Sequence, residues 1–281
     1  MLALRAVPNM AMQGKGGTTG MGDDYNFDNT QKGNIYSAWG WGYTITQMPG
    51  GAVAQLYGAK NTWLWFMSAA GASSLFIPIG AALGGAGGAI YVVVFLSFVS
   101  GLGQGPLYPG KEGLFGSWIP LSEMAFAQGF INGWWSGGQA FAQLLTPAIM
   151  IYLGWEYAYY FFGGFVLLFC WSWKVWAYNT PEDDPKCSPE ERALIAEGKG
   201  ESDESQSFDP NLYWAILAQK PIFIFMVRAV LRGYSGSYFN ILPYYLEQQG
   251  GFSVTMAGIV SAVQGFGKIV ILSRFACCPS R

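Results

Sequence analysis

Two arginines four residues apart lie in an apolar segment that is long enough to cross a lipid bilayer. Arg228 and Arg232 both fall within residues 221–247, and residues four apart share one face of a helix. If this helix enters the membrane near Lys220, a rise of about 1.5 Å per residue places Arg232 roughly 18 Å deep, near the middle of a ~30 Å hydrocarbon core. An arginine at that depth costs roughly 2.5–3.5 kcal/mol or more. We therefore expect both arginines to face water, a counter-charge or an anionic ligand, although the shallower Arg228 can also reach the interface.

The composition of the chain indicates a membrane protein. Of its 281 residues, 52% are hydrophobic and only 11% are charged, whereas soluble domains carry about 25% charged residues. The net charge is −2 and no basic stripe is interleaved with aromatic residues, so we expect no nucleic-acid partner. The lack of histidine excludes a Ser-His-Asp triad and an HExxH zinc site, and the cysteines form no CxxC pair. We accordingly predict no enzyme activity, no catalytic residues, no metal and no cofactor.

Hydropathy divides the chain into long apolar segments with polar connections. The expected spanning helices cover about residues 34–57, 61–83, 89–115, 125–153, 155–178, 221–247 and 254–276. Residues 14–33 are polar and glycine-rich and are predicted to form an exposed loop. In the acidic segment 179–219, the run Ser188-Pro189-Glu190-Glu191 predicts a capped short helix that ends at Gly198. Basic residues gather in the loops on the side of this segment, which predicts that it is cytoplasmic.

Several motifs inside the spans have a structural or a chemical interpretation. Gly129, Gly133 and Gly137 form a small-xxx-small row that favours close helix packing. The run Gly101-LGQG lies inside a span with no preceding strand, so we do not interpret it as a nucleotide-binding loop. Glu112 is the carboxylate well inside the first five spans and is the candidate for binding a coupling ion. Its neighbour Lys111 is expected to point to a different helix face, so no simple ion pair is predicted between them.

The string Trp41-GYTITQMPGG resembles the second-helix signature of the anion:cation symporter family of the major facilitator superfamily. This family includes sodium–phosphate cotransporters, sialin, vesicular glutamate transporters and plastid phosphate transporters. Further matches follow in the same order and at comparable spacing: Gly105-PLYPG, Trp118-IPLSE, Gly154-Trp155, Tyr178-NTPEDDPKCSPEERALI and Leu242-PYYL. The resemblance implies an all-α, polytopic membrane protein with the superfamily fold, which comprises two six-helix bundles.

Four regions follow from this resemblance. Residues 1–33 correspond to the tail of the first helix and an exposed loop, and residues 34–178 to about five helices of an N-terminal transmembrane bundle. Residues 179–219 form the cytoplasmic acidic linker with its short helix, and residues 220–281 begin a C-terminal bundle. The fold is therefore expected to be incomplete, with most of one bundle and the start of the other.

The resemblance also assigns candidate positions for binding a substrate. Arg5 matches a first-helix basic residue that handles anions, and Arg232 lies at or next to a basic position of the seventh helix. Three positions depart from the family pattern: Tyr36 replaces a histidine of the glutamate transporters, Ser97 a fourth-helix arginine, and Gln104 a coupling glutamate. The side chains of Tyr36, Tyr43, Tyr108 and Gln104 are predicted to line the cavity as neutral hydrogen-bonding groups.

These observations predict a multi-pass secondary transporter of a small anion, either an organic acid or inorganic phosphate, coupled to H⁺ or Na⁺. In this mechanism two helix bundles rock about a site at the middle of the lipid bilayer. Two alternatives stay open. A truncated membrane protein would not transport, because half a cavity cannot alternate access. A transporter of a neutral solute is favoured by Ser97 and Gln104 and opposed by Arg5 and Arg232.

Overall fold

The computed structural model describes most of the chain before residue 199 and short stretches after it. The described residues are 2–12, 19–198, 219–224, 227–228, 245–246, 249–253, 255–256, 259–260 and 262–263. Within these ranges the chain forms helices and turns, and no strand is present. The expected all-α class is therefore confirmed, whereas Arg232 and most of the two last predicted spans lie outside the described residues.

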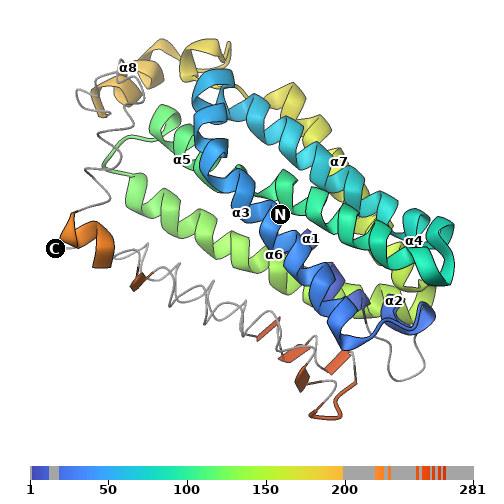
Figure 1. Ribbon diagram of the computed structural model, residues 1–281. Helices are drawn as coiled ribbons and strands as arrows, with labels where there is room; N and C mark the ends of the chain where they lie inside the picture. The colour runs from blue at the N-terminus through green and yellow to red at the C-terminus, as the bar shows by residue number, and fades with distance from the viewer. Residues whose placement is uncertain are drawn as a thin grey trace.

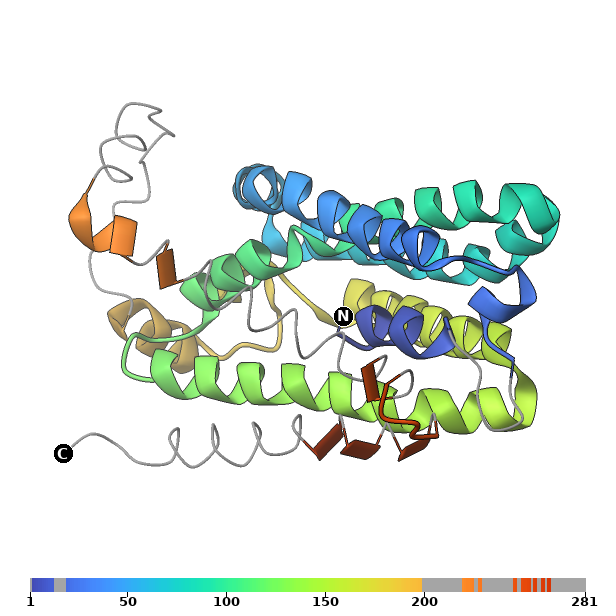
Figure 2. The ribbon, with the colours of Figure 1, turned by 60° about the horizontal axis from the view of Figure 1, so that its bottom comes forward.

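The long helices α3, α4, α6 and α7 run side by side, with short helices at both ends of the bundle (Figure 1). Their bounds are α1 (Leu2–Ala11), α2 (Met21–Asp24), α3 (Asn29–Tyr57), α4 (Ala59–Gln104), α5 (Leu107–Trp118), α6 (Met124–Leu153), α7 (Trp155–Trp176), the 3-10 turn η1 (Pro181–Asp183) and α8 (Pro189–Gly198). Helix α4 packs against α3 and α7, and α1 packs against α6 and α7 (Figure 2). Helices α2 and α8 lie at opposite ends of the bundle (Figure 1).

Helix α4 contains two of the predicted spans, because the chain reverses within it. At Gly85 the backbone has φ 60° and ψ −170°, a conformation that glycine adopts without steric cost. The turn expected at residues 84–88 is thus present as a sharp kink. The second half of α4 continues through a turn at Gly105 and Pro106 into α5. Together they form the segment predicted over residues 89–115.

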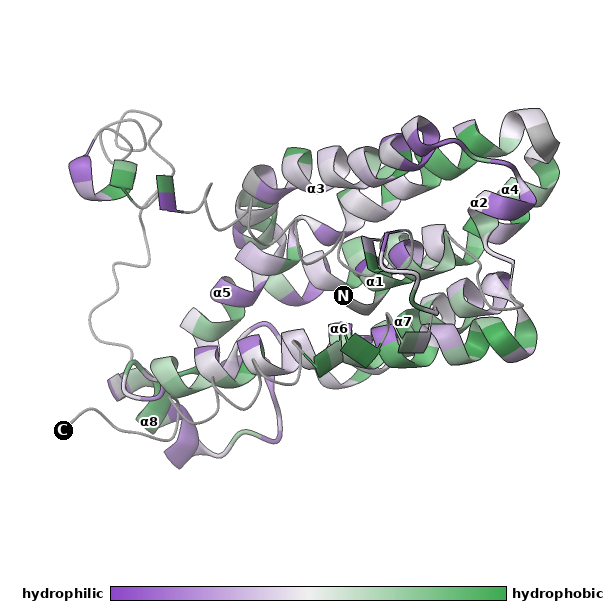
Figure 3. Ribbon diagram, turned by 90° about the horizontal axis from the view of Figure 1, so that it is seen from below, coloured by the Kyte–Doolittle hydropathy of each residue, from purple (hydrophilic) through white to green (hydrophobic). Residues whose placement is uncertain are grey.

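Three helical segments of the described part are long and apolar enough to cross a membrane. They are Ala59–Gly85, Gly87–Trp118 and Trp155–Trp176. Helices α3 and α6 have the necessary length, with 29 and 30 residues, but both carry polar side chains among the apolar ones. Figure 3 shows hydrophilic residues on α2 and α8 at the two ends, with more hydrophobic helices between them. This distribution fits a bundle whose middle lies in lipid.

The outward surface of α7 is apolar up to its last turn, where Lys174 is exposed. Phe161, Phe165, Leu168 and Trp171 are exposed on one face of this helix, while its opposite face is buried against the bundle. A helix that is hydrophobic on all sides is typical of a membrane span, because its outer face contacts lipid instead of water.

The segment 14–33, predicted to be an exposed loop, differs from its prediction in the part that the structure describes. In the described part of residues 14–33, Met21 and Phe27 are buried and α2 packs against the bundle, so this part is not an exposed loop. Asp24 Oδ2 accepts a hydrogen bond from Trp155 Nε1 at 2.7 Å. Helix α3 begins at residue 29, earlier than expected, because Asp28 caps it: the Asp28 carboxylate accepts from Gln31 N at 2.7 Å. The polar composition of this segment concealed its buried contacts.

At the other end, the first part of the acidic segment is bound to the bundle. The predicted short helix is confirmed as α8, and Ser188 Oγ accepts from Glu191 N at 3.1 Å as an N-cap. Gly198 O accepts from Leu121 N at 3.1 Å. Asn179 has two roles: its Oδ1 accepts from Lys60 N at the start of α4, at 2.9 Å, and its carbonyl accepts from Trp118 Nε1 at 3.1 Å. Asn179 therefore joins the start of α4 to the end of α5.

Helices α3 and α4 cross at closely packed glycines, and this crossing sets which residues face each other. A Cβ atom at Gly42 would collide with the carbonyl of Phe98, and one at Gly101 would collide with the carbonyl of Trp39. Thr46 Oγ1 donates a hydrogen bond across the crossing to Leu102 O at 2.9 Å. Such backbone proximity is possible only with small residues and is common between membrane helices.

We expect Gly101→Ala to destabilise the bundle, because the added methyl group has no space at the crossing. Overpacking of this kind costs about 1–3 kcal/mol, so the melting temperature of the purified protein in detergent should fall. Gly116→Ala in α5 is the matched control, since a Cβ there meets nothing within 4 Å; alanine should leave the stability unchanged or raise it. Equal melting temperatures for the two variants would contradict the close crossing.

Candidate functional site

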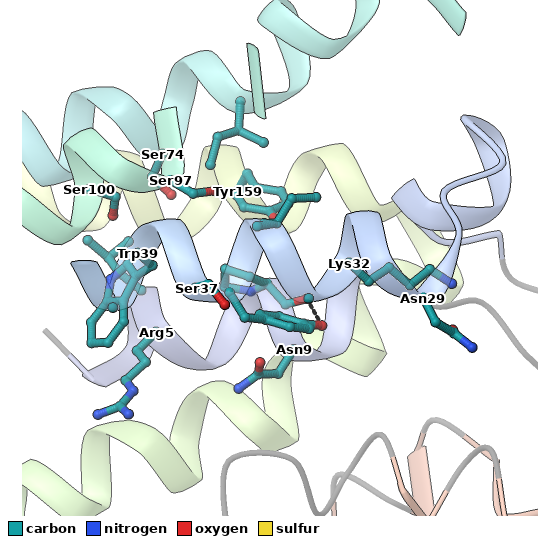
Figure 4. Close-up of a pocket in the computed structure, with 17 residues that line it drawn as sticks. Arg5, Asn9, Asn29, Lys32, Ser37, Trp39, Ser74, Ser97, Ser100 and Tyr159 are labelled. Carbon is teal, nitrogen blue, oxygen red and sulfur yellow. Dashed lines mark hydrogen bonds between the residues drawn. The ribbon is translucent and has the colours of Figure 1, made fainter. Parts of the chain in front are cut away.

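A cavity of about 500 Å³ lies between α1, α3, α4 and α7. Its described lining includes two cations, Arg5 from α1 and Lys32 from α3, and no aspartate or glutamate. Most other polar groups are hydroxyls and amides, among them Asn9, Ser37 and Ser97. Figure 4 shows these side chains and the four helices that contribute them. The cavity is therefore positively charged and rich in neutral hydrogen-bonding groups.

The guanidinium of Arg5 rests on an aromatic ring. Its Cζ lies 4.6 Å from the ring centroid of Trp39, which in turn stacks on Tyr43 with centroids 5.2 Å apart. This cation–π contact positions the guanidinium without neutralising it. No acidic side chain forms an ion pair with Arg5 in the part of the chain that the structure describes. Its N–H donors thus remain able to bind an anion.

The wall opposite Arg5 is formed by small hydroxyl side chains. Ser74, Ser97 and Ser100 of α4 and Tyr159 of α7 line this side, and they lie across the cavity from α1 in Figure 4. Serine at position 97 leaves space that a larger side chain would fill. On α3, the indole Nε1 of Trp39 is buried and has no hydrogen-bond partner among the described residues.

Gln104 lies behind this wall and is fully buried, so it does not line the cavity as predicted. Its Nε2 donates to Ser100 Oγ at 3.1 Å, and Ser100 does line the cavity. Its Oε1 has no partner among the described residues. Gln104 can therefore orient Ser100 but does not reach the cavity itself.

A second cavity, of about 690 Å³, lies at the other end of α3, between α3, α5 and the segment after α7. Tyr108 and Glu112 line it, together with Gln47, Gln55 and Asn179. The two cavities are separated by the glycine crossing of α3 and α4. Of the predicted site residues, Arg5 and Tyr36 thus line one cavity, and Tyr108 and Glu112 the other.

Contrary to the prediction, Lys111 and Glu112 form an ion pair. Lys111 Nζ lies 2.8 Å from Glu112 Oε1, and Gln128 of α6 bonds both partners: its Oε1 accepts from Lys111 Nζ at 2.7 Å, and its Nε2 donates to Glu112. The long lysine side chain folds back over the ring of Tyr108, with Nζ 4.5 Å from its centroid. Adjacent residues on a helix can pair in this way because the long, flexible lysine side chain can bend and bring its ammonium group to the neighbouring carboxylate.

The two partners of this pair differ in burial. The side chain of Lys111 is 2% exposed, whereas that of Glu112 is 43% exposed. Glu112, which is predicted to lie well inside a span, is therefore partly exposed in the described structure. Its role in binding a coupling ion stays a prediction.

The remaining predicted residues are placed as follows. Tyr36 lines the first cavity and its hydroxyl lies 3.5 Å from Pro8 O. Tyr43 stacks on Trp39 and is not among the residues that line either cavity. Arg228 is exposed in the short stretch where it is described, and Arg232 lies outside the described residues, so neither is placed at the cavity.

Lys32 is the charged residue of the cavity that the sequence does not predict. It stands four residues before Tyr36 and seven before Trp39, so helical spacing alone puts all three on one face of α3. It was assigned to an exposed loop because the residues around it are polar. In the structure it is 8% exposed.

Comparison with known proteins identifies relatives of the chain. Residues 13–276 match the family model described as Major Facilitator Superfamily. The chain is 27% identical over 257 residues to vesicular glutamate transporter 1 of Bos taurus, an alignment that covers 88% of this chain and 44% of that protein. It is also 27% identical over 259 residues to a probable galactarate/D-glucarate transporter of Bacillus subtilis, covering 85% and 54% respectively. The chain thus spans about half the length of the curated relatives it matches.

We expect Glu112→Gln to destabilise the bundle, because Lys111 would remain buried without its anionic partner. Removing one partner of a buried pair costs about 3–5 kcal/mol, and the partial exposure of Glu112 should reduce this to roughly 1–2 kcal/mol. Lys111→Met with Glu112→Gln should restore part of the loss, since it removes the buried charge. A double-mutant cycle of melting temperatures measures the coupling; additive effects of the two substitutions would refute the pairing.

Proposed function

Because this chain belongs to the major facilitator superfamily, we propose that it takes part in moving a small organic anion across a membrane as a secondary transporter. The chain is a multi-pass integral membrane protein and not an enzyme. The resemblance of its motifs to the anion:cation symporters is confirmed, since vesicular glutamate transporters are among its relatives.

The observation that carries the proposal is the charge of the first cavity. Arg5 and Lys32 line it, and no acidic residue does so among the described ones. A cation within an apolar bundle loses hydration energy, which water in a cavity, a counter-charge or an anionic ligand restores. The hydroxyl and amide groups of the wall supply further hydrogen bonds to such a ligand. This arrangement favours an anion over a neutral solute.

An organic anion is a better fit to the cavity than inorganic phosphate. A volume of about 500 Å³ falls within the range of sites for small organic molecules, roughly 300–1,000 Å³, and is much larger than a phosphate ion. The relatives also support this choice, because their names specify glutamate and galactarate or glucarate, which are organic acids. We therefore assign the substrate to the organic acids.

Alternating access would use the two cavities at opposite ends of α3. In this mechanism the described bundle forms one of two bundles that rock about the site, and the glycine crossing keeps α3 and α4 rigid during the movement. Arg228 and Arg232 would add positive charge from the other bundle. A coupling H⁺ or Na⁺ would compensate the charge of the substrate, and Glu112 is the acidic residue among the described lining of the second cavity.

Arg5→Gln should weaken the binding of an organic anion by at least tenfold, because it removes the cation that contacts the ligand; a hydrogen bond to a charged group contributes about 1.5–3 kcal/mol. The measurement is isothermal titration calorimetry on the purified chain in lipid nanodiscs. Lys186→Gln is the matched control, since it removes a positive charge from an exposed position far along the chain. Unchanged affinity of Arg5→Gln, or equal affinity for an uncharged analogue, would contradict the proposal.

A further inference from the structure

We propose that Gln104 is a positioning residue of the first cavity: it keeps the hydroxyl proton of Ser100 available to the cavity, where this proton binds an acceptor group of the anion. This inference rests on the proposed function, because it concerns how the same cavity selects its ligand. It depends on the burial of Gln104, on the direction of its hydrogen bond to Ser100, and on the place of Ser100 in the cavity wall.

The amide of Gln104 is fully buried in α4, and only one of its two polar atoms is hydrogen-bonded. The residue is 0% exposed. Its Nε2 donates to Ser100 Oγ at 3.1 Å, whereas its Oε1 has no partner in the part of the chain that the structure describes. A buried polar atom without a partner destabilises a fold, so each such atom in a native protein requires an explanation. An apolar side chain of the same size would avoid this cost, and packing alone therefore does not explain a glutamine here.

The hydrogen bond between Gln104 and Ser100 has a defined direction. An amide nitrogen donates and does not accept, so Ser100 Oγ is the acceptor and its own proton is not used in this bond. Hydroxyl side chains within helices often donate to a backbone carbonyl about one turn earlier, as Thr62 and Ser73 of α4 do. Ser100 makes no such bond among the described residues. Its proton is therefore available to a group in the cavity.

Ser100 presents this proton on the cavity wall. Its side chain lines the first cavity, and in Figure 4 it lies at the same end of the view as Trp39 and Arg5. A carboxylate oxygen only accepts hydrogen bonds, and a hydrogen bond to a charged group is stronger than one between neutral groups. Ser100 thus adds a directed donor to the positive charge of Arg5, and Gln104 maintains this donor without contacting the ligand.

Without the amide, the hydroxyl of Ser100 has a different partner. Methionine at position 104 would fill a similar volume and carry no donor. The hydroxyl would then turn and donate to a backbone carbonyl of its own helix, as that of Ser73 does. The cavity would lose a donor, while the bundle would lose a buried acceptor that has no partner. We therefore expect Gln104→Met to weaken anion binding without lowering stability, a combination that a merely structural glutamine would not give.

The test measures the glutarate affinity and the melting temperature of the 281-residue chain in lipid nanodiscs. Gln104→Met should weaken glutarate binding roughly 3- to 10-fold, and its melting temperature should equal or exceed that of the wild-type chain. Ser100→Ala should weaken binding by a similar factor. The double variant should bind glutarate as weakly as Gln104→Met alone, because Gln104 acts only through the hydroxyl of Ser100. It should also melt above Ser100→Ala, which leaves the buried amide without any partner.

Ser73→Ala is the matched control. Ser73 is buried on the same helix, but its hydroxyl already donates to Ala70 O at 2.9 Å and it does not line the cavity. This substitution should leave the glutarate affinity unchanged. Weaker binding of glutarate by Ser73→Ala would show that any lost hydroxyl of α4 disturbs the site, and it would overturn the specific role of Ser100.

Three results would overturn the role of Gln104. They are an unchanged glutarate affinity in Gln104→Met, losses of affinity that multiply in the double variant, and a lower melting temperature of Gln104→Met that accompanies its weaker binding. The last result would make Gln104 a structural residue only. All three leave the anion site beside Arg5 intact. Failure of organic anions to bind the wild-type chain would instead refute the proposed function itself.

Discussion

A positive charge inside an apolar helix bundle has to be solvated, paired or bound to an anion. This constraint applies to the guanidinium of Arg5. Its guanidinium lies on the ring of Trp39, and no ion pair with an acid is present in the described part of the chain. A cation–π contact contributes about 0.5–2 kcal/mol, less than the cost of removing a full charge from water. The position of Arg5 is therefore stable only if the adjoining cavity holds water or an anion.

The architecture of the bundle maintains this situation. The glycine crossing brings the backbones of α3 and α4 together, so that Trp39 faces the serines of α4 and no large side chain fills the space between them. At one end of the bundle, α2 packs against Lys32 through Gly22 and is fixed by the hydrogen bond between Asp24 and Trp155. At the opposite end of the bundle, Asn179 joins α4 to α5. The cavity thus forms because small residues in the middle of the bundle leave space and the contacts at its two ends keep the helices in place.

Lys111 shows the other way in which this bundle stabilises a buried cation. Its ammonium has a carboxylate, an amide oxygen and an aromatic face as partners, so its charge is compensated within the protein. Arg5 and Lys32 have no acidic partner of this kind. Lys111 is therefore a structural cation, whereas Arg5 and Lys32 are available to a ligand.

Much of the helix pattern could be predicted from the sequence, because long apolar segments and capping residues are local signals. Among the described residues, the spans (apart from the earlier start of α3), the turn near Gly85 and the cap at Ser188 follow from such signals and were located correctly. The segment 14–33 was not, because the burial of Met21 and Lys32 depends on contacts with distant helices. The pairing of Lys111 with Glu112 was missed for the same reason, since Gln128 of another helix holds both. For the site, the family resemblance indicated Arg5 and Tyr36, which line the cavity. It also indicated Gln104, which lies one helix turn after the lining residue Ser100 and does not reach the cavity.

Cysteine labelling at Ser97 tests most directly whether the cavity is hydrated and binds an anion. The four native cysteines are replaced by serine, Ser97→Cys is introduced, and the rate of modification by a small water-soluble thiol reagent is measured in nanodiscs. We expect modification, and we expect an organic anion such as glutarate to slow it saturably while its uncharged diamide does not. A thiol that never reacts, or one that glutarate and the diamide protect equally, would contradict an anion-binding cavity beside Arg5.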